Sequence, residues 1–233
     1  GMLKVIVENP AKKLSPKWKT AVQSVLDVYL GKNPSEFTFE GKTYTPASFL
    51  AFTKINPDSY VSLTSFTNQP FYKSFIINIP DNFSNGSFYN LPLEELVQNI
   101  DNALDKGFTL SLDCDVSEPY FSGKYGIAAV PANEADNKTI LTEIKPEKTI
   151  TPEYRQQEFE NLTTQDDHLM HIVGKVKDQK GNFYYKVKNS WGTENMGNEG
   201  FIYMSVAYVK LKAISVLVHK EALLTNTKKI LSL

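Results

Sequence analysis

The sequence has little cysteine, and this scarcity excludes two classes of protein. Cys114 is the only cysteine among 233 residues. One thiol cannot close an internal disulfide, and it cannot build a cysteine-rich zinc site. The three histidines are scattered and do not form a metal-binding pattern. We therefore expect neither a disulfide-stapled secreted fold nor a metal or other cofactor.

An excess of charge of one sign is missing as well. Lys and Arg number 25 and Asp and Glu number 26, which gives a formal net charge of -1. This balance offers no electrostatic footprint for nucleic acid. No apolar run approaches the ~20 residues that cross a bilayer, and no signal-peptide pattern opens the chain. We expect no nucleic-acid partner and no membrane, and a cytoplasmic location is favoured.

The first part of the chain has helical patterns around a short hairpin. Apolar residues recur at the helical period over 15–30, after Ser15 and Pro16, and predict an amphipathic helix whose stripe packs in a core. Residues 37–44 alternate around Glu40-Gly41 and predict a hairpin. A second helix is expected from Thr45-Pro46 onward. We interpret residues 1–58 as a helical insertion region with a short hairpin.

The second part, residues 59–233, is richer in β-patterns. Strands are predicted over 59–66, 74–80 and 108–114, a loop over 81–89, and helices over 92–106 and 152–160. Four further strand-like runs follow from residue 168. Helices with a few strands, followed by a block of strands, favour an α+β fold with an antiparallel sheet. This part is predicted to be a β-rich lobe with packed helices.

A hairpin over residues 168–191 brings polar groups together. The turn DQKGN, centred near residue 179, makes the numbers of opposed residues sum to roughly 357–359. His168 and Asn189 sum to 357, so they are expected to be opposed or one position apart. Side chains alternate along a strand, so His168 and His171 point to opposite faces and at most one serves a given site.

The groups on this hairpin form a recognisable chemical unit. The Asn189 side-chain oxygen can accept a hydrogen bond from one ring nitrogen of His168 and hold the ring in place. The other ring nitrogen is then free to take a proton from a thiol. Trp191, two residues after Asn189, can shield that hydrogen bond from water.

The motifs around these residues resemble a known family. The segments KNSWG at 188–192 and GFIYMS at 200–205 resemble papain-like cysteine peptidases, and DDHLMHIVG resembles the bleomycin hydrolase and aminopeptidase C branch. The resemblance covers about 15–220 and implies a papain-like fold. It gives the catalytic role to His168, the orienting role to Asn189 and the supporting role to Trp191.

The chain departs from this family at the nucleophile. The family's cysteine lies on a helix within a Gln…Cys-Trp stretch, which this sequence does not contain. Cys114, in the strand-like LDCDV, matches a non-catalytic family position. The resemblance therefore implies the His/Asn part of a cysteine aminopeptidase that is inactive alone and acts on peptides once a Cys-bearing segment completes it. We expect a homo-oligomer that covers the apolar surface left by the other lobe.

Other interpretations stay open at this point. Gly1 before Met2 is expected to be the remnant of a cleaved tag, with Met2 opening a truncated piece. The chain could instead be a non-catalytic binding or assembly module that kept the peptidase fold, or an unrelated β-rich binding domain. His171 and His219 are expected to be structural, and Asp113 and Asp115 are expected to cap a loop or form a salt bridge.

Overall fold

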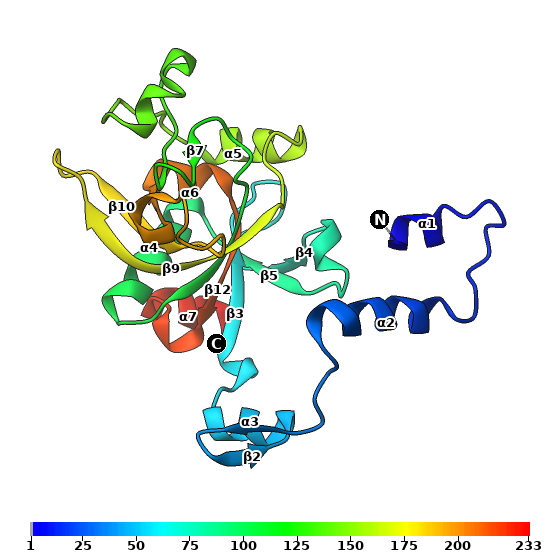
Figure 1. Ribbon diagram of the computed structural model, residues 1–233. Helices are drawn as coiled ribbons and strands as arrows, with labels where there is room; N and C mark the ends of the chain where they lie inside the picture. The colour runs from blue at the N-terminus through cyan, green and yellow to red at the C-terminus, as the bar shows by residue number, and fades with distance from the viewer. Residues whose placement is uncertain (1) are drawn as a thin grey trace. The chain divides into compact units, whose positions relative to one another are not determined.

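The computed structural model describes residues 2–233, which divide into two compact units (Figure 1). The first unit ends at Asn56, and the second runs from Pro57 to Leu233. Compactness does not show that either unit folds alone, so the division of the chain into domains at residue 58 stays a prediction.

The first unit contains three helices and a two-stranded hairpin. The helices are α1 (Met2–Val7), α2 (Trp18–Leu30) and α3 (Pro46–Thr53), and the strands are β1 (Phe37–Phe39) and β2 (Lys42–Tyr44). The Thr45 side chain caps α3 by accepting a hydrogen bond from the Ser48 amide at 3.1 Å. No residue of α2 is buried, so the prediction that its apolar stripe packs in a core is wrong.

The second unit is built on a ten-stranded sheet (Figure 1). The central strands lie in the order β3, β12, β6, β9, β10 and β11, and all neighbours among them are antiparallel. Two pairs nearer the edges, β3 with β5 and β11 with β8, are parallel, so the antiparallel prediction is wrong there. The strands are β3 (Tyr60–Thr64), β4 (Ser74–Ile76), β5 (Ser87–Asn90), β6 (Leu110–Cys114), β7 (Phe121–Ser122), β8 (Ile127–Ala128), β9 (His168–Lys177), β10 (Phe183–Lys188), β11 (Phe201–Ser205) and β12 (Ala213–His219).

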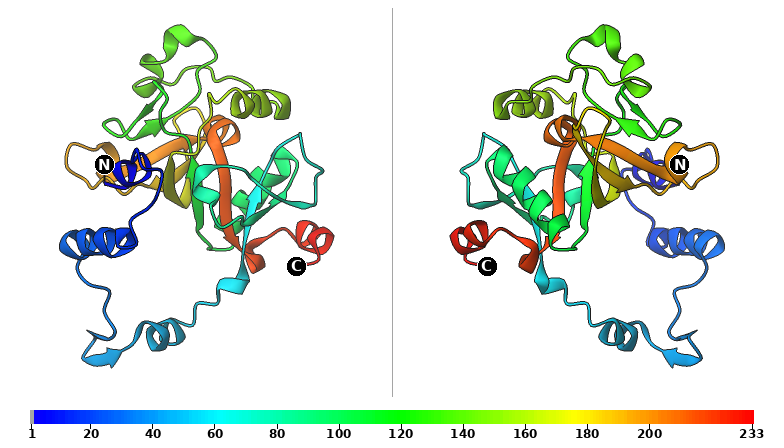
Figure 2. Two further views of the ribbon diagram at one scale, coloured as in Figure 1. Left: turned by 90° about the vertical axis from the view of Figure 1, so that its right-hand side faces the viewer. Right: turned by 90° about the vertical axis from the view of Figure 1, so that its left-hand side faces the viewer.

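Four helices belong to this unit, and α4 packs its apolar stripe into the core. They are α4 (Leu93–Asp105), α5 (Pro152–Glu160), α6 (Val206–Lys212) and α7 (Thr225–Leu231). Leu93, Leu96 and Ile100 recur on one stripe of α4 and are almost completely buried, each contributing about 1.5–3 kcal/mol of transfer free energy. Helices α6 and α7 lie at opposite ends of β12 (Figure 2). The predicted α+β class is confirmed, but the loop predicted over 81–89 is wrong where β5 begins.

The hairpin of β9 and β10 contains a bulge. Between the turn and the pair Lys186↔Gly174 the opposed residue numbers sum to 360, and from Val187↔Ile172 onward they sum to 359. Val173 is therefore an extra residue on β9. The predicted sum of 357–359 holds only beyond the bulge, so Asn189 follows β10 beside Met170. This position is diagonal to His168 on the same face, and not opposite it.

Candidate active site

His168 opens strand β9 on the face of the sheet that packs in the core. It pairs with Cys114 of β6, and the next residues on its face, Met170 and Ile172, are buried. The imidazole itself is partly exposed, because it stands at the end of the strand. The strand therefore fixes the ring at the boundary between core and surface.

Asn189 holds the ring and determines which nitrogen carries a proton. Its Oδ1 lies 2.8 Å from Nε2 of His168. The backbone N–H of Ser190 donates to the same oxygen at 2.7 Å, so this atom is an acceptor and the amide orientation is set. Nε2 must then be the donor, which leaves Nδ1 as the nitrogen that can accept a proton. Within residues 2–233 no group hydrogen-bonds to Nδ1.

Trp191 covers the His168 ring. The ring centroids of His168 and Trp191 lie 5.0 Å apart at an interplanar angle of 35°. Phe121 meets the indole edge-on with a centroid distance of 5.9 Å. Trp191 is still 46% exposed, so one side of this aromatic group is open in the structure.

Three glycines allow the backbone around Trp191 to pack closely. A Cβ on Gly123 would lie 2.9 Å from Sδ of Met196 and 3.2 Å from the Trp191 ring, and a Cβ on Gly200 would lie 2.4 Å from the Gly192 carbonyl oxygen. Gly192 and Gly200 also have φ of 81° and 82°, which favours glycine. A larger residue at Gly123 or Gly200 would therefore collide with the segment around Trp191.

The other two histidines lie outside this group. His171 is exposed on the opposite face of β9, where its Nε2 lies 2.7 Å from Oγ1 of Thr109. His219 stacks on Phe108 with a centroid distance of 5.1 Å, and its Nδ1 accepts a hydrogen bond from the Glu221 amide. Among residues 2–233 no group of three His, Cys, Asp or Glu side chains is placed to hold a metal ion.

Cys114 is next to His168 in the sheet, but its thiol is in the core. Opposed residues in a ladder point to the same face, yet Cys114 is fully buried and packs in the hydrophobic core. Its Sγ donates to the Asp115 carbonyl oxygen at 3.3 Å, and no hydrogen bond in the described chain joins it to His168. Burial raises the pKa of this thiol well above its usual range, which disfavours the nucleophilic thiolate.

A buried ion cluster fixes the segment before His168. Asp115 accepts hydrogen bonds from the Ser117 and Gln165 amides, and the Lys212 ammonium lies 3.4 Å from its Oδ2. Burial acts to raise the pKa of Asp115, but these hydrogen bonds and the Lys212 charge outweigh it, and the pKa lies below its usual value. Lys212 also pairs with Glu118 and donates to the Thr163 carbonyl oxygen at 3.0 Å.

Sequence reasoning missed several of these supporting groups. Phe121 and Gly123 lie far from the hairpin in sequence, and no pattern joined them to Trp191. Lys212 is buried although lysines are almost always exposed. Its position between Leu211 and Ala213, next to an apolar strand, was the sequence feature that could have predicted this burial. Asp115 does form the expected type of salt bridge.

Comparison with known proteins extends these observations. A model of the Peptidase C1-like family matches residues 9–232. Aminopeptidase G of Lactobacillus delbrueckii subsp. lactis is 27% identical over 232 residues, covering 91% of this chain and 49% of that protein. The crystal structure of PepW from Lactobacillus rhamnosis HN001 matches with a TM-score of 0.70 at 19% identity, covering 99% of this chain and 54% of that chain. The chain thus spans about half the length of these relatives. Among the helices of residues 2–233, none has the length and hydrophobicity that a bilayer crossing requires.

Proposed function

This chain belongs to the Peptidase C1-like family, and we propose that it supplies the histidine and asparagine of a papain-like cysteine peptidase site. The match to the family confirms the predicted papain-like fold. The observation that carries the proposal is the 2.8 Å contact between Nε2 of His168 and Oδ1 of Asn189. In this proposal a different segment of polypeptide supplies the thiol.

The geometry supports the chemistry of a thiolate–imidazolium pair. Nδ1 of His168 is free to take the proton of a thiol placed beside it, which forms a thiolate nucleophile and an imidazolium ion. Oδ1 of Asn189 accepts the Nε2–H bond, which becomes charge-assisted and stronger once the ring is protonated. Trp191 limits the access of water to that bond. The imidazolium then returns the proton to the leaving amine when the peptide bond breaks.

Two features of the site support a missing neighbour that brings the thiol. Nδ2 of Asn189 is buried and has no acceptor among residues 2–233, and an unsatisfied buried donor costs about 1–3 kcal/mol. Trp191 is 46% exposed although it covers the histidine. A segment that docks beside both residues would provide an acceptor and bury the indole. Cys114 does not meet this need, because its thiol is buried in the core.

For the substrate we propose peptides cleaved from their N-terminus. Aminopeptidase G, which is 27% identical, supports this choice by its name. We also propose that the chain assembles as a homo-oligomer. Val28, Tyr29 and Leu30 on α2 are each about 80% exposed, and soluble proteins rarely expose large contiguous apolar patches. Light scattering on the purified chain tests the oligomer directly.

The decisive experiment complements the chain with a thiol-bearing partner. The chain is assayed with an aminoacyl fluorogenic substrate alone and after mixing with the half of Aminopeptidase G that the alignment leaves uncovered. We expect hydrolysis only in the mixture, with Cys114→Ala fully active there. Hydrolysis by the chain alone that disappears in Cys114→Ala would show that Cys114 is the nucleophile and would overturn the proposal.

The alternative is a non-catalytic module that keeps the peptidase fold. Because the only thiol of the sequence is buried, a non-catalytic module is favoured over an enzyme whose whole active site lies in this chain. The same mixture distinguishes the two functions. A complex that forms, seen as a shift in sedimentation, but does not hydrolyse the substrate would support the module and count against the peptidase site.

A further inference from the structure

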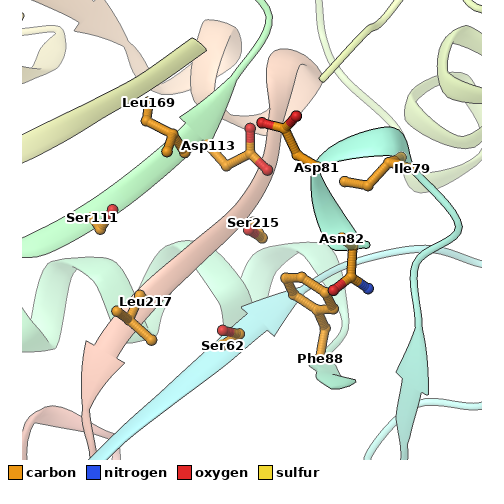
Figure 3. Close-up of a pocket in the computed structure, with 10 residues that line it drawn as sticks. All are labelled: Ser62, Ile79, Asp81, Asn82, Phe88, Ser111, Asp113, Leu169, Ser215 and Leu217. Carbon is orange, nitrogen blue, oxygen red and sulfur yellow. The ribbon is translucent and has the colours of Figure 1, made fainter. Parts of the chain in front are cut away.

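A depression opens on the face of the sheet opposite His168 (Figure 3). Its volume is about 260 Å³. Three serines from neighbouring strands line it, Ser62 of β3, Ser111 of β6 and Ser215 of β12. The carboxylates of Asp113 and Asp81 face one another at one end (Figure 3). This is a polar hollow that the proposed peptidase site does not use.

The hollow contains polar groups whose hydrogen-bonding capacity is unmet. Ser215 is only 7% exposed, and within residues 2–233 its hydroxyl has no hydrogen-bond partner. Oδ1 of Asp113 is buried and accepts no hydrogen bond from a donor group in the described chain, and the side chain that the Asp113 carboxyl meets is another acid, Asp166, whose Oδ2 lacks a donor as well. Buried polar atoms are nearly always paired with protein, water or a ligand. An acceptor and a hydroxyl without partners in one cavity point to a ligand that donates hydrogen bonds.

The groups around the hollow are acidic and have no cationic partner in the described chain. Asp81 and Asp113 line it, and Asp166, in the segment that precedes β9, meets the Asp113 carboxyl. Asp167 acts on Asp113 through its charge, while its own Oδ1 accepts a hydrogen bond from the Val116 amide. Among the described residues none of these four carboxylates forms a salt bridge. Burial, together with the neighbouring Asp166, Asp81 and Asp167, raises the pKa of Asp113 to about 8. A bound positive charge would oppose that shift, because it favours the ionised form of the carboxyl.

We propose that this hollow is a binding site for an alkylammonium group. An ammonium offers three N–H donors and no acceptor, which suits the acceptor oxygens of Asp113 and Asp81 and the free hydroxyl of Ser215. The remaining wall is apolar, with Phe88, Leu169 and Leu217, and it matches a methylene stem. The ammonium can belong to a free amine or to a lysine side chain of a polypeptide, since both present the same group.

The binding test uses two ammonium probes and an uncharged control on the full chain. The probes are 1,5-diaminopentane and Nα-acetyl-lysine amide, and the control is 1-pentanol. We expect saturable shifts of the Ser111, Asp113 and Ser215 amide resonances with an ammonium probe and none with pentanol. A response to the diamine alone identifies a free amine, and a response to the lysine derivative identifies a lysine side chain.

Substitutions connect the response to the carboxylates. Asp113→Asn is expected to weaken binding at least about tenfold, because a hydrogen bond to a charged group contributes about 1.5–3 kcal/mol. Asp81→Asn, at the exposed mouth, is expected to weaken it less and serves if Asp113→Asn does not fold. The matched control Asp105→Asn, an exposed acid at the end of α4, is expected to leave affinity unchanged.

The pH dependence gives an independent readout. The Asp113 carboxyl loses its proton near pH 8, while a primary ammonium with a pKa of ~10.4 stays charged. Affinity should therefore rise from pH 6.5 to pH 9, and binding at pH 7 should release a proton that calorimetry in two buffers detects. Absent or non-saturable shifts with both ammonium probes would overturn the proposal. Equal binding of pentanol, or unchanged binding by both Asp113→Asn and Asp81→Asn, would overturn it as well.

Discussion

Strand β9 presents one histidine to each face of the sheet, and the two environments differ. On the core side His168 meets Oδ1 of Asn189 at 2.8 Å and lies under Trp191. On the outer side His171 is exposed, and its Nε2 lies 2.7 Å from the Thr109 hydroxyl. The outer face also has Asp113 and its acidic neighbours. Residue type alone did not decide the roles of the two histidines, because only His168 has an asparagine side chain that fixes the orientation of its ring.

The bulge at Val173 decides which histidine receives Asn189. With the register near the turn, where opposed numbers sum to 360, Asn189 would lie opposite His171. The extra residue changes the sum to 359 and moves Asn189 to the face of His168. A shift of one residue in a strand exchanges its faces, so one bulged residue decides which of the two histidines contacts Asn189.

Under the proposed function, the largest expected difference between the faces is in catalysis by the chain complemented with a thiol-bearing segment. His168→Ala should reduce kcat/KM at least about 10³-fold, since loss of a catalytic base removes both nucleophile activation and proton return. His171→Ala is the matched control on the same strand and should stay within about twofold. Steady-state hydrolysis of an aminoacyl fluorogenic substrate measures both. Similar losses of kcat/KM in the two variants would contradict a catalytic role that is specific to His168.

A smaller effect is expected when the holding group is removed. Asn189→Ala should lower kcat/KM about 10²-fold, because the ring loses the acceptor that selects its tautomer. The chain alone provides a second measurement, since ¹⁵N NMR of the imidazole reports which nitrogen is protonated. In the unaltered chain at a pH where the ring is neutral, we expect the proton on Nε2 of His168. A proton on Nδ1 would contradict the assignment made from the Ser190 N–H.

The support of Trp191 should have an effect on stability. Gly123→Ala places a methyl group within 3.2 Å of the indole and should reduce the free energy of unfolding by about 1–3 kcal/mol, as overpacking does. Gly174→Ala on β9 is the control, since its nearest neighbour is 3.9 Å away. Urea unfolding followed by Trp191 fluorescence, with Trp18 replaced by Phe, measures the difference. Equal stability of the two variants would argue against tight packing under the tryptophan.

The free energy of unfolding should depend on pH through Asp113 on the outer face. Its pKa of about 8 in the folded chain exceeds the ordinary ~3.9. Between about pH 4 and 8 the unfolded chain gives up a proton that the folded chain keeps, so stability falls as pH rises through this window. Asp113→Asn should lack this loss and gain at least about 1.4 kcal/mol over the unaltered chain between pH 4.5 and pH 8, which thermal unfolding measures.

The turn and the side-chain alternation around the site were predictable, because both depend on residues that are close in sequence. The turn at DQKGN formed with Gly181 at a φ of 88°, and alternation placed His168 with Met170 and Ile172. The register was not predictable in the same way, since a bulge depends on how both strands pack and leaves no turn signal. The exposed stripe of α2 was misjudged because amphipathicity shows that a face is apolar and not what covers it.

The sequence by itself determined the α+β class, the hairpin, the opposite faces of His168 and His171, and the presence of a single thiol, because these follow from composition and from the two-residue period of a strand. The tertiary structure alone decided that Asn189 reaches His168, that Phe121 and Gly123 lie against Trp191, that the Cys114 thiol is buried in the core, and that acids surround Asp113. Each of these depends on contacts between residues far apart in the chain, and such contacts are set when the strands and helices pack together.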